Sequence, residues 1–138
     1  MQAILGVDNL QGKQGPVPIS SLEGKYVFIY FSAHWCPPCR GFTPVLAEFY
    51  KANAASKNFE IIFVSSDRDQ KSFDEYYGEM PWLALPFDKR AEKDKVSGNF
   101  QVKGIPTLIL FGPDGKMITN QARGNVTSDK SCSNFPWA

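Results

Sequence analysis

The chain has 138 residues, 43% of them hydrophobic, and its eleven Phe, five Tyr and three Trp give bulk to a core. This size predicts a single domain over residues 1–138 and leaves no room for a second one. Fifteen basic and fourteen acidic residues give a formal net charge of +1, so composition gives no electrostatic reason to expect a nucleic-acid or membrane partner.

The sequence has no feature of an exported protein. Its start, Met1–Gly6, lacks the basic and long apolar segments of a signal peptide, and no apolar run approaches membrane-spanning length. Three cysteines, two of them in one short motif, do not form the disulfide framework of a secreted domain. We therefore expect a soluble protein in a reducing compartment, the cytosol first and the nucleus second.

The first 25 residues predict a short edge hairpin that leads into a central strand. The apolar stretches Ile4–Val7 and Val17–Ile19 lie on either side of a turn region rich in Gly and Asn. Tyr26–Phe31 then forms a continuous run of β-branched and aromatic residues. Such a run is typical of a strand that is buried on both faces of a parallel sheet.

A long helix is expected after the central strand. Its apolar positions recur at helical spacing, and they are Phe42, Val45, Leu46, Phe49 and Tyr50. Pro44 lies inside this pattern, so we expect it to kink the helix without ending it. Phe59–Val64 predicts a second buried strand, which completes a strand-helix-strand crossover over residues 26–64.

The second half of the chain predicts two helices, a hairpin and a last helix. The first helix is amphipathic, and its apolar positions are Phe73, Tyr76, Tyr77 and Met80. The second, over residues 88–100, is solvated and has a thin apolar stripe of Ala91, Val96 and Phe100. A hairpin follows, with arms 107–111 and 116–119, and a short helix is expected around 128–133. This order predicts an α/β fold with a central mixed β-sheet flanked by helices on both faces.

Two thiols lie at the junction of the central strand and the long helix, in Trp35-Cys36-Pro37-Pro38-Cys39-Arg40. Cys36 is expected near the N-cap and Cys39 in the first turn. The unpaired N–H groups and the positive end of a helix dipole favour a thiolate there. Cys36 is therefore the expected nucleophile, and Cys39 is placed to attack a mixed disulfide formed at Cys36.

The two prolines limit how far the pKa of Cys36 falls. Pro37 suits the first helical position, but neither Pro37 nor Pro38 has an N–H to offer the sulfur. Backbone donors are left only at Cys39 and Arg40. We expect a lowered pKa for Cys36, helped by the Arg40 charge, without an extreme depression.

A structural zinc site is the alternative use of the cysteine pair. Such a site normally needs two further ligands, and Cys132 and His34 are the remaining Cys and His candidates. His34 lies too close to the pair to close a tetrahedron easily. The sequence thus favours a redox dithiol with no metal and no organic cofactor, and Cys132 is expected to be an inert thiol.

The motif and the residues after it, Gly41-Phe42-Thr43-Pro44, resemble the tryparedoxin and nucleoredoxin branch of the thioredoxin superfamily. The resemblance covers most of the chain and includes the segments Phe63–Asp67, Met80–Ala84, Gly104–Thr107 and Phe135–Trp137. It implies a thioredoxin fold. Ser66 stands where tryparedoxins resemble one another in a Trp, which favours nucleoredoxin. Tyr30 stands where thioredoxin carries a buried Asp, so that proton acceptor cannot be transferred to this chain.

The resemblance also implies several supporting residues. The family places a cis-proline opposite the dithiol, which corresponds to Ile105–Pro106 here, and an extended substrate could pair with the backbone of residues 104–105. Trp35 is expected to be a partly exposed lid and a contact for substrates. Arg123 resembles an arginine that the family uses toward its substrates, although a solvated arginine is an open alternative.

Asp67 has two open interpretations. It ends the second buried strand, and strand C-termini of such sheets converge at the active-site edge, so it could help to move the Cys39 proton. It could equally be a surface carboxylate beside Arg68 and Asp69.

The function expected from these features is thiol-disulfide oxidoreduction. The chain would reduce protein disulfides, those of peroxiredoxins among them, and would receive electrons from an upstream dithiol or reductase. We expect it to act as a monomer. The alternative is a redox-sensitive regulatory binding module of nucleoredoxin type, in which the cysteines set partner affinity with little turnover.

Overall fold

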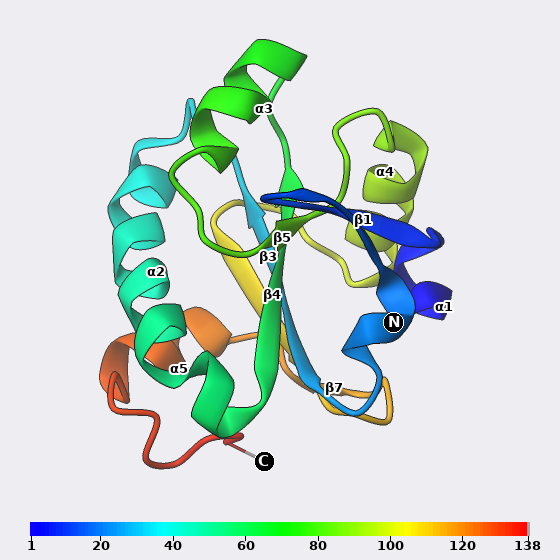
Figure 1. The fold of residues 1–138 in the computed structure, drawn as a ribbon. Helices are drawn as coiled ribbons and strands as arrows, with labels where there is room; N and C mark the ends of the chain where they lie inside the picture. Colours follow the sequence, from blue (N-terminus) through cyan, green and yellow to red (C-terminus); the bar gives the residue numbers. More distant parts are fainter. Residues whose placement is uncertain (138) are drawn as a thin grey trace.

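The computed structural model describes residues 1–137 and contains a seven-stranded sheet in the order β2-β1-β5-β4-β3-β6-β7 (Figure 1). The strands are β1 Asn9–Gly12, β2 Gly15–Pro18, β3 Tyr26–Ser32, β4 Phe59–Ser65, β5 Leu83–Ala84, β6 Thr107–Phe111 and β7 Met117–Thr119. The central strand β3 pairs parallel with β4 and antiparallel with β6, so the sheet is mixed.

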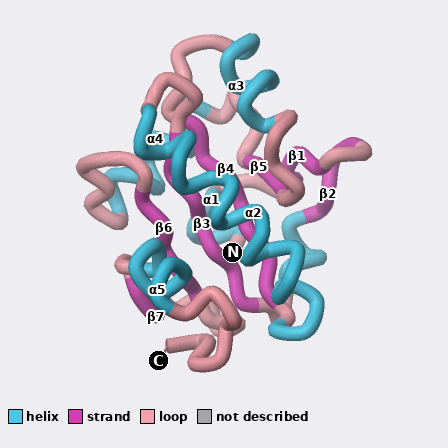
Figure 2. The backbone as a smooth tube through the Cα atoms, turned by 90° about the vertical axis from the view of Figure 1, so that its left-hand side faces the viewer, coloured by secondary structure: helices cyan, strands magenta, loops and turns pink. Residues whose placement is uncertain are grey.

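Helices cover both faces of this sheet. They are α1 Gln2–Leu5, the 3-10 helix η1 Ile19–Leu22, α2 Pro37–Lys57, α3 Gln70–Tyr77, α4 Arg90–Asn99 and α5 Ala122–Ser128. Buried side chains of α2, α3 and α5 join one core cluster, and those of α1, η1 and α4 join the other. Figure 1 shows α2 and α5 together on one side of the sheet, away from α1 and α4, and Figure 2 views the molecule from that side. The predicted fold class is confirmed.

The central strand carries both cores because its side chains alternate between the faces of the sheet. Phe28 and Tyr30 point into the cluster under α2, whereas Ile29 and Phe31 point into the cluster under α4. Burying one such side chain contributes about 1.5–3 kcal/mol. This explains why the run is continuously apolar rather than alternating.

Several predicted elements are confirmed. The structure contains the two predicted strands that begin at Tyr26 and Phe59. It also contains the hairpin of β6 and β7 and the helix over residues 90–99. Helix α2 continues through Pro44, as predicted, and ends at Asn58, which adopts a left-handed conformation with φ 56°. The residue before the helix, Cys36, is its N-cap.

The prediction for the N-terminus was partly wrong. Ile4–Val7 is not a strand: α1 occupies residues 2–5, because Leu5 is buried against the core and Gly6 ends the helix with φ 72°. The first arm of the hairpin is instead β1, which pairs with β2 through Leu10 and Val17. The short strand β5, beside β1 and β4, was not predicted.

Three smaller predictions about the helices were also wrong. Met80 is buried but lies beyond the end of α3. Ala91 is exposed, so the buried position of α4 is Val96. The last helix is α5, over residues 122–128 rather than 128–133.

The segment after α5 is shaped by one carboxylate instead of by helical hydrogen bonds. Asp129 accepts from the backbone N–H groups of Ser133 (3.1 Å) and Asn134 (2.8 Å), and from the indole N–H of Trp137 (3.0 Å). These bonds lower the pKa of Asp129, the Trp137 bond most of all. They hold Phe135 and Trp137 against the core.

Candidate active site

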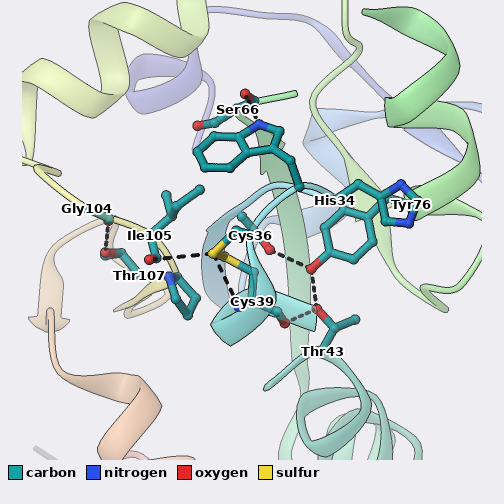
Figure 3. The surroundings of a disulfide bond; sticks show 12 residues. His34, Cys36, Cys39, Thr43, Ser66, Tyr76, Gly104, Ile105 and Thr107 are labelled. Atoms are coloured by element: carbon teal, nitrogen blue, oxygen red, sulfur yellow. Dashed lines mark hydrogen bonds between the residues drawn. A yellow bond between two sulfur atoms is a disulfide. The ribbon is translucent and has the colours of Figure 1, made fainter. Parts of the chain in front are cut away.

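Cys36 and Cys39 form a disulfide at the beginning of α2, with their Cα atoms 5.2 Å apart (Figure 3). Cys36 is the N-cap residue in an extended conformation, and the backbone N–H of Cys39 points at its sulfur, 3.3 Å away. The strand-to-helix junction therefore brings the first sulfur to the positive end of a 21-residue helix.

Among the described residues, the backbone N–H of Cys39 is the donor that points at the Cys36 sulfur. The N–H of Arg40, the other expected donor, is bonded to the carbonyl oxygen of Cys36 at 3.0 Å. Pro37 and Pro38 have no N–H. The site thus gives the sulfur one N–H donor rather than two, and the Arg40 side chain is exposed.

The two cysteines differ in their access to solvent. Cys36 is 5% exposed and Cys39 is 0% exposed, so an incoming disulfide can reach only the first. Both pack with Ala33 in a small cluster that Ile105 covers on one side. This difference in exposure suits Cys36 to attack a substrate disulfide and Cys39 to resolve the mixed disulfide that forms.

The segment before β6 lies against the dithiol. The Ile105–Pro106 peptide bond is cis, and the carbonyl oxygen of Ile105 lies 3.9 Å from the Cys36 sulfur (Figure 3). Arg123, at the start of α5, donates from Nη1 to the carbonyl oxygen of Pro106 at 3.0 Å. Its guanidinium also lies 5.6 Å from the centre of the Phe42 ring. Arg123, Ile105 and Pro106 are therefore brought together beside Cys36.

Trp35 lies in the loop before the dithiol and is 54% exposed. Its indole N–H donates to the carbonyl oxygen of Ser66 at 3.2 Å, which fixes the orientation of the ring. The guanidinium of Arg68 lies over the ring, 5.7 Å from its centre. Trp35 thus offers an exposed and oriented apolar surface next to Cys36.

Asp67 is buried and is bonded to the loop that carries the dithiol. Its carboxylate accepts from the backbone N–H of His34 at 2.8 Å and from the hydroxyl of Ser65 at 2.8 Å. Both carboxylate oxygens are engaged in these two bonds. Among the described residues, the structure thus brings Asp67 to His34 and Ser65 rather than to the Cys39 sulfur.

A cluster of buried hydroxyl groups lies beneath the dithiol and was not predicted. The Thr43 hydroxyl donates to the carbonyl oxygen of Cys39 at 3.0 Å, and it lies 2.8 Å from the Tyr30 hydroxyl and 2.6 Å from that of Tyr76. Ser32 extends the cluster, 2.6 Å from the Tyr76 hydroxyl. Burial raises the pKa of Tyr30 far above its ordinary range, so its hydroxyl stays neutral.

One feature of the sequence indicates this cluster. Tyr30 and Ser32 carry two of the three hydroxyl groups of β3, the third being that of Tyr26 at its first position, and their spacing of two places them on the same face. Their partners could not be deduced, because Thr43 and Tyr76 come from α2 and α3.

Comparison with known proteins gives the family. A family model described as Thioredoxin-like matches residues 24–117, a span that includes the dithiol and Pro106. The chain belongs to the thioredoxin-like family.

Two groups of relatives resemble this thioredoxin-like chain. Tryparedoxin from Trypanosoma brucei brucei is 53% identical over 133 residues, which cover 96% of this chain and 92% of that protein. Human nucleoredoxin is 53% identical over 119 residues, which cover 86% of this chain and 27% of that protein. The chain thus spans nearly all of a tryparedoxin and about a quarter of a nucleoredoxin.

Solved structures agree with the sequence comparison. Tryparedoxin I from Crithidia fasciculata matches with a TM-score of 0.95 at 46% identity, over 99% of this chain and 96% of that one. Tryparedoxin II in complex with glutathionylspermidine matches with a TM-score of 0.92 at 47% identity, over 95% and 92% of the two chains. The predicted resemblance is confirmed, and the thioredoxin-like chain is a thiol-disulfide oxidoreductase of tryparedoxin and nucleoredoxin type.

Tyr30 and Ser66, two positions that the sequence analysis singled out, both contact the dithiol region. Tyr30 places its hydroxyl 3.3 Å from the carbonyl oxygen of Cys39, so this position still contacts the second cysteine, through a neutral donor. Ser66 uses its backbone carbonyl to hold Trp35.

The third cysteine of this thioredoxin-like chain lies away from the dithiol. Cys132 is free and fully buried in the core under α2, and burial raises its pKa to about 11. At neutral pH its thiol is protonated and weakly nucleophilic.

Within residues 1–137, no three His, Cys, Asp or Glu side chains lie together as a metal site, and no helix is long and apolar enough to cross a membrane.

Proposed function

We propose that this chain reduces disulfides of other proteins, peroxiredoxins among them, with Cys36 as the nucleophile and Cys39 as the resolving thiol. The observation that carries the assignment is the unequal burial of the two cysteine residues, 5% exposed for Cys36 against 0% for Cys39. The N–H of Cys39 and the helix N-terminus act in the same direction, since they stabilise a thiolate at Cys36.

The reaction has two exchange steps. In the first, the Cys36 thiolate attacks one sulfur of the substrate disulfide, a mixed disulfide forms, and the other substrate sulfur leaves as a thiolate. In the second, the Cys39 thiolate attacks the Cys36 sulfur and releases the remaining substrate sulfur. Two electrons have then passed to the substrate, and Cys36 and Cys39 form a disulfide. An external dithiol or a reductase returns both electrons, and no bound metal or organic cofactor is needed.

The surrounding residues have supporting roles in this proposal. The backbone at Ile105 and Pro106 would pair with an extended substrate segment, and Arg123 would hold that backbone in place through the Pro106 carbonyl. Trp35 would contact apolar parts of the substrate. Asp67 would position the loop before Cys36 rather than accept a proton. We further propose that the chain acts as a monomer in the cytosol or nucleus.

Trapping of mixed disulfides tests the proposal. Because Cys39 resolves the intermediate, Cys39→Ser should accumulate covalent adducts with protein substrates that dithiothreitol releases. The unmodified protein should show few adducts, and Cys36→Ser should show none. Cys132→Ser is the matched control and should behave as the unmodified protein.

The same experiment separates the enzyme from the alternative, a redox-sensitive binding module. A binding module predicts that partners are recovered equally with Cys36→Ser, without covalent attachment. If Cys39→Ser traps nothing and the intact protein reduces insulin no faster than free dithiol does, the proposed function is wrong.

A further inference from the structure

The exposed surface around Cys36 includes Arg68, whose side chain contacts the ring of Trp35. Arg68 follows the end of β4 and is exposed, and its guanidinium lies 5.7 Å from the centre of the Trp35 ring. The ring is itself fixed by its bond to Ser66. A guanidinium over an indole face is attracted by the ring electrons. Arg68 therefore lies over Trp35, the residue that precedes the nucleophile.

Further cations come from other segments of the chain. Arg40 directly follows Cys39 and is exposed. Arg123 is exposed and bonded to the backbone of Pro106. Lys103 is exposed just before the 104–106 segment that lies against Cys36. We call Arg40, Arg68, Lys103 and Arg123 the basic rim.

The carboxylates of the same region, those of Asp67, Asp69 and Glu79, offset only part of this charge. Asp67 is buried, and both of its oxygens are bonded within the chain. Asp69 is the N-cap of α3, where it accepts from the backbone N–H of Ser72 at 2.7 Å. Glu79 lies 3.9 Å from the His34 ring nitrogen. Asp69 and Glu79 are exposed and Asp67 is buried, so the exposed groups named here are four cations and two carboxylates.

We propose that the basic rim, with Arg68 as its specificity-determining residue, selects disulfides in protein segments that carry Asp or Glu next to the cystine. A guanidinium binds a carboxylate through two parallel N–H bonds, a geometry that the planar Arg68 side chain can offer from its place on the ring. An extended segment paired with the backbone at Ile105 would bring its flanking side chains to the rim. This inference rests on the proposed function, because the selected segment must be a substrate of Cys36.

Three cystine peptides of equal length test the inference. They differ only in the residues that flank the cystine, which are Glu, Ser or Lys. The measured quantity is kcat/KM for their reduction by the intact protein at low and at high salt. We expect the order Glu, then Ser, then Lys, and we expect the differences to shrink at 1 M salt, where charges are screened within about 3 Å.

Charge reversal assigns the preference to one residue. Arg68→Glu should lower the ratio of kcat/KM for the Glu peptide to that for the Lys peptide by roughly five-fold, the size expected when a surface charge about 7 Å from the substrate charges is reversed at moderate salt. Arg68→Gln should give an intermediate ratio. Lys51→Glu is the matched control: Lys51 is exposed on α2 about 18 Å beyond Cys39, so the ratio should not change.

The outcomes separate this inference from the proposed function. Reduction of all three peptides at equal rates, or an unchanged ratio in Arg68→Glu, overturns the inference and leaves the reductase intact. An equal change in Lys51→Glu also overturns it, because the effect would then come from net charge. If no peptide is reduced faster than by free dithiol, the proposed function fails, and this inference fails with it.

Discussion

The backbone N–H of His34 donates to the carboxylate of Asp67 across 2.8 Å and joins the loop before the dithiol to the end of β4. The same carboxylate also accepts from the hydroxyl of Ser65. Both oxygens of the buried Asp67 carboxylate are thus bonded within the chain, and we expect Asp67 to hold the loop before Cys36 in place.

Asp67→Ala should destabilise the protein by about 1–3 kcal/mol, because it leaves a donor without its partner in a part-buried place. Urea unfolding of both proteins measures this. Asp67→Asn keeps an oxygen that can accept from His34, so it should cost less. An Ala variant as stable as the parent protein would contradict the expectation that Asp67 holds this loop in place.

The hydroxyl cluster under the dithiol gives a second stability prediction. Thr43→Val keeps the shape of the side chain but removes the donor to the Cys39 carbonyl and the partner of two tyrosine hydroxyls. We expect a loss of about 1–3 kcal/mol in the free energy of unfolding, measured by guanidinium titration. Thr43→Ser, which keeps the hydroxyl, is the control and should lose less. A Thr43→Val variant as stable as the parent protein would mean that the hydroxyl contributes nothing.

The lowered pKa of Asp129 predicts a dependence of stability on pH. A carboxyl with a lower pKa in the folded state stabilises the fold above its unfolded pKa of about 4 and loses that contribution as pH falls through the folded value. Asp129→Asn should therefore lower Tm at pH 7, and the difference from the parent protein should shrink below about pH 4. A difference in Tm that is constant from pH 7 to pH 3 would show that the charge of Asp129 is not involved.

The central part of the fold could be predicted because its signals are local. The strands β3 and β4 are buried on both faces, so each is a largely apolar run, interrupted in β4 by Glu60 and ended in both strands by a Ser. The junction before Pro37 fixes Cys36 at the N-cap, and this placement is confirmed. The two ends of the chain were harder to predict. Leu5 is buried as part of a helix of four residues, a length too short to show a period.

The rest depends on contacts between distant segments. The last helix was placed too late because residues 129–134 fold around the Asp129 carboxylate, a side-chain interaction that hydrophobic periodicity does not detect. The hydroxyl cluster joins β3, α2 and α3. Arg68 and Trp35 meet only because the loops after β3 and β4 lie at the same edge of the sheet.

The identity of the nucleophile is the central claim, and alkylation of the reduced native protein tests it most directly. With iodoacetamide at limiting concentration and peptide masses as the readout, Cys36 should be modified first, with a pH midpoint below the free-thiol value of about 8.5. Cys39 should react slowly because it is fully buried, and Cys132 should react only after unfolding because it is buried and its pKa is raised to about 11. Preferential modification of Cys39 or Cys132, or a midpoint for Cys36 at or above 8.5, would contradict the account.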